Sequence, residues 1–381
     1  MAIKNDFSST ALTGLDAASY SLSLISNNIA NVNTSGYKSA GANFYELLSS
    51  GSVGSGVQAG NVQYSFEQGA AVQTGVGTNM MISGEGFFNV KDPGTGQLYY
   101  SRSGAFTLQD GYLVNEQGYH VQGFQGTSQS GATSDIQISQ TPLAPSATAN
   151  VNFTGNLNPA TNNGASQTVT FYDAAGNSHT LGVSFNYNST SKLWGLSYTV
   201  DGTAQPQTPA QTMGFDASGN INSGQTQTVN TGIGTLNLSL AGMTGYGGSN
   251  MTGPTATADG YPAGTYSNFT VEQGGVIVEK YTNGQTKQVG SIALSSFFIN
   301  GALQNAGGGN WTASSGVGTI TTGVSGSAGL GDISTGQLEG SNVNLSNQVV
   351  DMISAQRDFQ SDAQVLKVGK LLDQTVLNID N

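Results

Sequence analysis

The chain has 381 residues, more than one ordinary hydrophobic core accommodates, so we expect two or three domains. Lys and Arg number 10 and Asp and Glu 22, so only 8% of the residues are charged and the net charge is −12. This acidic balance argues against nucleic-acid binding, and no apolar run approaches the ~18 residues of a membrane span. With no cysteine, the chain has no disulfides, thiolate metal sites or cysteine nucleophiles.

The first predicted element is a helix over residues 7–32, which contain no proline and a single glycine, Gly14. Its apolar residues recur at alternating steps of three and four, the heptad pattern of an amphipathic or coiled-coil helix. The stripe consists of Ala11, Leu15, Ala18, Leu22, Ile25, Ile29 and Val32. Poor helix formers follow from Asn31, and Gly36 is a candidate left-handed C-cap.

The segment from about residue 60 to residue 335 predicts β-structure. Short apolar runs are separated by glycine-containing turns every 8–12 residues, a spacing typical of sandwiches and barrels. Asp92-Pro93-Gly94 and Asp110-Gly111 are turn signals, because proline presets φ and glycine accepts positive φ. The β-pattern changes over residues 146–287 and then resumes, so we predict an outer β-domain inserted into an inner one.

A second helix is predicted near the C-terminus, with Ser346 as its N-cap. Its stripe has the same spacing and consists of Val349, Met352, Gln356, Phe359, Ala363 and Leu366. Each terminal helix could pack on its own domain. Since both stripes lie at the chain ends, pairing with each other or with neighbouring copies is the favoured interpretation.

The sequence offers no catalytic, cofactor-binding or metal-binding constellation. His120 and His179 are far apart in strand-like runs with no third ligand in the pattern, and no zincin, hydrolase-elbow or P-loop motif occurs. The acids Glu272 and Glu279 are expected to be solvated strand residues. The residues alone therefore predict a structural or interaction protein, mainly β, that presents a helix at each end, rather than an enzyme.

One stretch carries a resemblance. Residues 25–38, Ile-Ser-Asn-Asn-Ile-Ala-Asn-Val-Asn-Thr-Ser-Gly-Tyr-Lys, resemble the signature N-N-I-A-N followed by T-x-G-[YF]-K of the bacterial flagellar rod and hook axial proteins. Residues 82–90, 100–106, 110–114, 338–345 and 352–360 are similar to further motifs of that family. Ser361-Asp362 departs from it, since an Ala-Asn pair is common there. The inserted β-domain favours the hook members over the rod members.

The resemblance implies a subunit that polymerises into a short curved tube, a universal joint that transmits motor torque. It implies a paired, coiled-coil-like helical assembly domain at residues 1–36 and 340–381 and a connecting arm at 37–70. An inner β-domain is then expected at 71–145 and 288–339, with the inserted outer domain at 146–287. The residues expected to mediate assembly are Leu15, Leu22, Ile25, Asn28, Ile29, Asn31, Val32, Val349, Met352, Gln356, Phe359 and Leu366. Thr34, Gly36, Tyr37 and Lys38 are expected to end the first helix and redirect the chain into the arm.

The implied partners are further copies of the chain, the flagellar rod at the proximal end, a hook–filament junction protein at the distal end and a hook cap during assembly. Export through the flagellar type III apparatus, without a cleaved signal peptide, would place the protein in the extracellular part of the flagellum. Two alternatives stay open: a distal rod protein with an unusual insertion, and a secreted β-rich carbohydrate-binding protein or enzyme.

Overall fold

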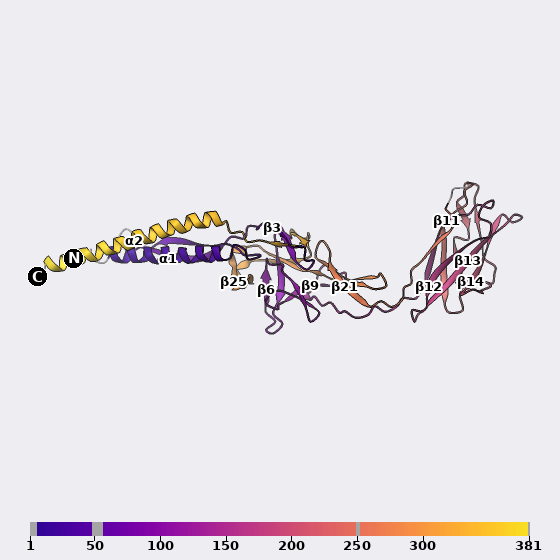
Figure 1. Ribbon diagram of the computed structural model, residues 1–381, viewed down its shortest axis with the longest axis horizontal. Coiled ribbons are helices and arrows are strands. Elements are labelled where there is room, and N and C mark those ends of the chain that lie inside the picture. The colour runs from indigo at the N-terminus through magenta and orange to yellow at the C-terminus, as the bar shows by residue number, and fades with distance from the viewer. Residues whose placement is uncertain (1–5, 48–55, 249–251, 380–381) are drawn as a thin grey trace. The chain divides into compact units, whose positions relative to one another are not determined.

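The computed structural model describes residues 6–47, 56–248 and 252–379 (Figure 1). The chain forms two compact units, of which unit 1 comprises residues 1–139, 269–279 and 287–381 and unit 2 comprises residues 140–268 and 280–286. The finer division into four domains expected from the sequence stays a prediction. Residues 48–55 of its connecting arm lie outside the described part of the chain.

Two long helices run antiparallel and side by side in unit 1 (Figure 1). They are α1, Asp6–Ala30, and α2, Leu345–Ile379. This pairing, together with the β-structure between them, confirms the predicted fold class. The expected N-cap Ser346 is wrong, because the Asn347 amide donates to Asn344 Oδ1 at 3.2 Å and makes Asn344 the cap. Ser346 lies inside the first helical turn, where such a bond is not available to it.

The β-part of unit 1 is built around one large antiparallel sheet whose main path runs β21-β22-β23-β9-β5-β6-β26-β25. The strands up to the insertion are β1 (Ala40–Glu46), β2 (Val57–Tyr64), β3 (Ala71–Gln73), β4 (Met80–Ser83), β5 (Phe87–Lys91), β6 (Leu98–Ser101), β7 (Thr107–Gln109), β8 (Tyr112–Val114), β9 (His120–Gln125) and β10 (Ser134–Asp135). Those after it are β21 (Tyr266–Val271), β22 (Val276–Tyr281), β23 (Thr286–Ile292), β24 (Leu294–Phe297), β25 (Leu303–Gly307), β26 (Asn310–Ala313), β27 (Ile320–Gly323), β28 (Asp332–Thr335) and β29 (Gln337–Glu339). Two short 3₁₀ turns, η1 (Asn300–Ala302) and η2 (Ser315–Val317), flank β25 and β26.

The connecting arm contains a hairpin, β1 with β2, that the sequence pattern did not predict. β1 pairs antiparallel with β2, with Ala40 opposite Tyr64, and both strands pack against α1. The amide of Val57 donates to Thr13 Oγ1 on α1 at 3.2 Å. The short apolar alternation of β2 is hard to recognise among the glycines and serines, and its packing on α1 is a long-range contact that local patterns do not show.

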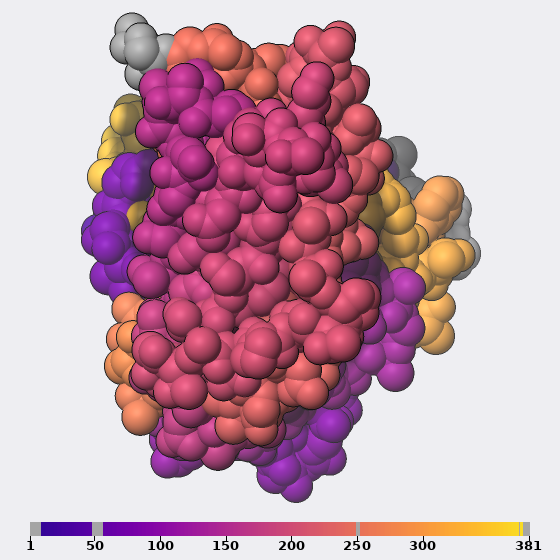
Figure 2. All heavy atoms as spheres, turned by 90° about the vertical axis from the view of Figure 1, so that its right-hand side faces the viewer, coloured from indigo at the N-terminus to yellow at the C-terminus, as the bar shows by residue number. Residues whose placement is uncertain are grey.

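Unit 2 is a sandwich of two sheets. Its strands are β11 (Asn150–Asn156), β12 (Ala165–Tyr172), β13 (Ser178–Asn188), β14 (Leu193–Val200), β15 (Thr203–Ala204), β16 (Thr212–Phe215), β17 (Ile221–Ser223), β18 (Thr226–Asn230), β19 (Thr235–Thr244) and β20 (Thr255–Ala258). One sheet has the order β18-β19-β11-β20 and the other β12-β13-β14-β16-β17. Phe153 and Leu238 from the first sheet and Phe185 and Trp194 from the second share one buried core. Figure 2 shows one face of this unit, formed by its magenta-to-red segments.

Candidate assembly surface and its buried junction

The predicted stripe of the first helix lies on a covered side of the chain. Ala11 and Ala18 are buried, and the five larger stripe residues, Leu15, Leu22, Ile25, Ile29 and Val32, are half-buried. Small residues let the two helices approach closely. At Gly14 an added Cβ would lie 2.5 Å from Oδ2 of Asp362 on α2. A larger residue at position 14 would therefore leave no room for the Asp362 side chain.

The stripe of α2 that packs inward coincides only in part with the predicted one. Ala355 is buried and five other residues at heptad spacing are half-buried, namely Gln348, Met352, Asp362, Leu366 and Gly369. Of the predicted α2 residues, Met352 and Leu366 are partly covered, whereas Val349, Gln356 and Phe359 are exposed. Neighbouring positions on a helix differ by about 100° in direction, so the exposed residues at 349, 356 and 363 point away from the side of α2 that packs inward.

A second, apolar surface of α2 remains exposed. Its members are 42–64% exposed and are Val349, Val350, Ile353, Val365, Val368, Leu371 and Leu372. Soluble monomers rarely expose long apolar surfaces unless these bind a partner. We call this set the outer apolar face of α2.

Asn28 joins α1 to the arm and to α2. It is 2% exposed, and its Nδ2 donates to the Ala40 carbonyl at 2.8 Å and to Gln348 Oε1 at 2.9 Å. Its Oδ1 accepts from the Ala40 amide at 2.9 Å and from the Tyr37 hydroxyl at 3.1 Å. A buried amide with both ends paired in this way fixes the relative positions of the three segments.

The end of α1 is held by the other motif residues. Asn31 Nδ2 donates to the Asn27 carbonyl at 2.9 Å, and Thr34 Oγ1 donates to Asn31 Oδ1 at 3.1 Å. Gly36 has φ +70°, and an added Cβ would lie 2.4 Å from the Ser103 backbone nitrogen. Only glycine combines this backbone conformation with this close approach to the β-part of unit 1.

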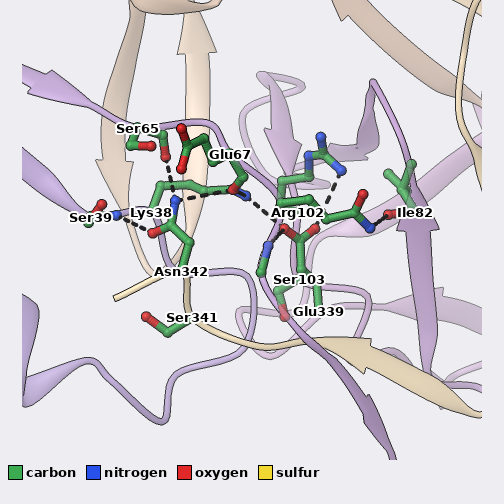
Figure 3. Close-up of polar contacts among 12 residues, drawn as sticks. Lys38, Ser39, Ser65, Glu67, Ile82, Arg102, Ser103, Glu339, Ser341 and Asn342 are labelled. Atoms are coloured by element: carbon green, nitrogen blue, oxygen red, sulfur yellow. Dashed lines mark hydrogen bonds and ion pairs between the residues drawn. The ribbon is translucent and has the colours of Figure 1, made fainter. Parts of the chain in front are cut away.

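Directly after the helix end, Lys38 lies in a fully buried ion cluster (Figure 3). Its Nζ lies 2.7 Å from Glu339 Oε1 and donates to the Glu67 carbonyl at 2.6 Å. Arg102 Nη1 lies 3.4 Å from Glu339 Oε2, and the Gly69 amide donates to Oε1 at 2.9 Å. The residues come from the arm, from the end of β6 and from β29, so one carboxylate connects three segments far apart in the sequence.

Burial lowers the pKa of Lys38 and of Arg102, whereas the Glu339 carboxylate acts to raise both pKa values. The guanidinium also donates through Nη2 to the Gly84 carbonyl at 2.9 Å and lies 5.3 Å from the centre of the Phe87 ring. These partners offset part of the cost of removing three charges from water. We call Lys38, Arg102 and Glu339 the junction triad.

Next to the triad, Asn342 ties the start of the C-terminal segment to the arm. Its Oδ1 accepts from the Ser39 amide at 2.7 Å, and its Nδ2 donates to the carbonyls of Ser65 at 2.8 Å and Glu67 at 3.1 Å (Figure 3). Arg102, Glu339 and Asn342 were not predicted as site residues. In a chain with 8% charged residues, the single charges at 102 and 339, each within an otherwise uncharged stretch, were the available signal.

The described residues contain no group of three or more His, Cys, Asp or Glu side chains that could hold a metal ion. His120 pairs with Asp135 at 2.8 Å, and His179 lies 2.8 Å from Asp201. The hydrogen bond that His179 donates to the Asp201 carboxylate raises the pKa of His179.

Glu279, expected to be solvated, is instead 1% exposed and accepts the Ser139 amide at 2.9 Å. Pairing with that amide makes its burial possible. Within the described residues, no helix has the length and apolar character needed to cross a membrane.

Comparison with known proteins identifies the family. Residues 9–38 match the family model described as "Flagella basal body rod protein", residues 81–158 match "Flagellar hook protein FlgE/F/G D1 domain", and residues 334–379 match "Flagellar basal body rod FlgEFG protein C-terminal". The crystal structure of Helicobacter pylori flagellar hook protein FlgE2 superposes with a TM-score of 0.54 at 15% identity. That superposition covers 69% of this chain and 98% of the other, and it supports the fold.

Two curated relatives extend over nearly the whole chain. Flagellar hook protein FlgE of Salmonella typhimurium is 34% identical, and the alignment covers 97% of this chain and 99% of that protein. Its counterpart in Escherichia coli K12 is 33% identical with the same coverage. These findings do not support the two alternatives, a rod protein with an insertion and a carbohydrate-binding protein or enzyme. The chain belongs to the bacterial flagellar hook protein family.

Proposed function

We propose that this protein is the structural subunit of a flagellar hook, the curved flexible tube that joins the rod to the filament and transmits torque. The observation that carries the proposal is the outer apolar face of α2, which continues along most of the helix while the other side of α2 packs on α1. Contact with copies of the same chain would remove this apolar surface from water. Each fully buried Leu or Val would contribute about 1.5–3 kcal/mol.

In this proposal the helix pair forms the inner part of the tube. The pair is stabilised from the first helix by Leu15, Leu22, Ile25, Ile29 and Val32, and from α2 by Met352 and Leu366. Val349, Gln356 and Phe359, which α1 leaves exposed, make contacts between subunits. The four-part division of the chain, with residues 71–145 and 288–339 as the inner β-domain and 146–287 as the outer one, belongs to the same proposal.

A second group of residues connects the helix pair to the rest of the subunit. It consists of Asn28, Asn31, Thr34, Gly36, Tyr37 and Lys38. They hold the end of α1 to the arm and to the β-part of unit 1 through the contacts described above. A helix pair that rotates with the motor must pass force to the rest of the subunit. The buried junction triad gives that connection a defined geometry, because breaking any of its contacts would leave a buried charge unpaired.

The proposed partners follow from a position between rod and filament. The polymer would contact the rod proximally and a junction protein distally, and a cap would guide its growth. We further propose export as an unfolded chain through the flagellar type III apparatus and a location in the extracellular part of the flagellum. Catalysis has no part in this function.

The outer apolar face is tested with the double variant Val368→Asp/Leu371→Asp. Two charges at exposed positions leave the fold intact, whereas a charge buried between subunits is strongly unfavourable. We expect no tubes by negative-stain electron microscopy of concentrated protein, with an unchanged circular dichroism spectrum. Thr170→Asp, on an exposed position of β12 in unit 2, is the control for an added charge. Normal tubes from the double variant would contradict the proposal.

A further inference from the structure

A protruding aromatic side chain marks one end of the β25–β26 hairpin. Phe298, between β24 and η1, is 83% exposed, and Ile299 beside it is 48% exposed. The protrusion is held in place, because the Phe298 amide donates to the Thr319 carbonyl at 3.3 Å and the Ile299 amide to the Val317 carbonyl at 3.1 Å. Neither residue packs in the core of unit 1, although Phe297 immediately before them does.

A cleft lies at the other end of the same hairpin. Its volume is about 320 Å³, and it is bounded by the end of α1, the start of the arm and the β25–β26 turn. Figure 1 shows β25 beside that end of α1. Leu24, Tyr37, Tyr64 and Trp311 provide its apolar lining, and Asn27 and Asn305 add amide groups. This volume is at the lower end of the range of about 300–1,000 Å³ for ligand sites, so it suits one or two side chains.

One wall of the cleft is bare backbone. Gly307, Gly308 and Gly309 line it, all with positive φ, and a Cβ added to Gly307 or Gly309 would meet nothing within 4 Å. Glycines with open space above them permit the close approach of another chain. Tyr64 packs edge to face on Trp311, which lines the same cleft, at 4.7 Å between ring centres. The aromatic lining is therefore preorganised.

A subunit cannot fill its own cleft with its own Phe298. β25 begins at Leu303, which packs in the core with Phe297 near the protrusion, and ends at Gly307 in the cleft wall. Five residues of strand separate the two features by roughly 15 Å. An aromatic protrusion and an aromatic cleft at opposite ends of one hairpin form a head-to-tail pair. Repetition of such a heterologous contact generates an open helical polymer.

We propose that Phe298 of one copy inserts into the cleft between α1 and the β25–β26 turn of a second copy. The inference rests on the proposed function, since it requires the chain to polymerise. A second copy is the occupant favoured by the structure because the protrusion and the cleft belong to the same chain and lie at opposite ends of one hairpin, so each copy offers one to each neighbour. The contact would supply a β-part interface in addition to the one between helices.

Cross-linking tests the contact directly, because the chain contains no cysteine that would react in the background. Ile299→Cys combined with Asn305→Cys places one thiol beside the protrusion and one at the cleft while leaving Phe298 in place. Treating the assembled polymer with a short bismaleimide should give a ladder of covalent multimers on denaturing gels. Ile299→Cys combined with Thr170→Cys should give none. Normal polymers of the first variant without a ladder would overturn the proposal.

The side chain itself is tested with Phe298→Ala. We expect at least a tenfold higher protein concentration to be needed for polymerisation, with an unchanged urea midpoint because the residue is exposed in the monomer. Phe298→Tyr, which keeps the ring, should polymerise nearly as the unmodified chain does. If Phe298→Ala polymerises normally, the inference fails while the proposed function stands. If the unmodified chain forms no polymer, the proposed function fails and the inference with it.

Discussion

Single residues show where this sparsely charged chain places its ions. Lys38, Arg102 and Glu339 are at most 2% exposed, although isolated charges are rarely buried. Lys38 belongs to the motif that ends α1, and Glu339 to the strand that precedes α2. Their pairing means that both helices leave the β-part of unit 1 from the same point.

Glu339→Gln tests the triad. The substitution keeps the size of the side chain but leaves two buried cations without a counter-charge, so we expect a loss of about 3–5 kcal/mol in the free energy of unfolding. Urea denaturation of the monomer measures it. Glu272→Gln, on an exposed side chain, should change the free energy by less than about 0.5 kcal/mol. If both substitutions lower the free energy of unfolding by the same amount, the triad stabilises the fold no more than an exposed carboxylate does.

At the scale of elements, the end of α1 decides the path of the chain. The helix stops at Ala30, and the chain turns at Gly36 against the backbone of Ser103. Two separate requirements meet at this glycine, a left-handed backbone and the absence of a side chain. Gly75 meets only the first of these requirements. Its φ is +69°, but the space that its Cβ would occupy is open.

Alanine at each of these glycines should therefore have different effects. Gly75→Ala should cost about 1–2 kcal/mol for the left-handed conformation alone. Gly36→Ala should cost the same plus about 1–3 kcal/mol, because the new methyl group overlaps backbone atoms that cannot move easily. Urea unfolding of the two variants gives the difference. If both lose the same stability, the close contact at Gly36 is not significant.

At the scale of the whole molecule, the long segment of unit 2, residues 140–268, is closed near its two ends by a pair of residues. Leu143 and Gly264 form an antiparallel bridge in which the Leu143 amide donates to Gly264 at 2.8 Å and the Gly264 amide donates back at 3.0 Å. The core of unit 2 contains no residue of the helix pair. The architecture thus allows most of unit 2 to be removed without breaking the strands that carry the assembly surface.

Replacing residues 144–263 by Asn-Gly should give a folded protein, since a two-residue turn fits a hydrogen-bonded antiparallel pair. If assembly depends on the terminal helices, this shortened chain should still form tubes in negative-stain electron microscopy. Adding Val368→Asp/Leu371→Asp to it should abolish them. A folded but non-polymerising shortened chain would assign assembly to unit 2 instead.

The sequence by itself determined the class of the two terminal helices and of the β-rich centre. Heptad spacing at both ends and regular turns between them predicted two helices around a β-rich centre, because periodicity and turn chemistry are local properties. The motif over residues 25–38 indicated the family for a similar reason, since its residues are contiguous. Local signals of this kind also indicated the left-handed backbone of Gly36, although α1 itself already ends at Ala30.

Only the tertiary structure decided which surfaces meet. It placed Gln348 and Ala355, rather than Val349 and Gln356, in the seam with α1, and it brought Lys38 within 2.7 Å of Glu339, 301 residues later. It also buried Glu279 and formed the hairpin of β1 and β2 in a segment expected to be a plain arm. Each of these depends on contacts between segments far apart in the chain. A periodic pattern specifies that a face is apolar, but not which partner covers it.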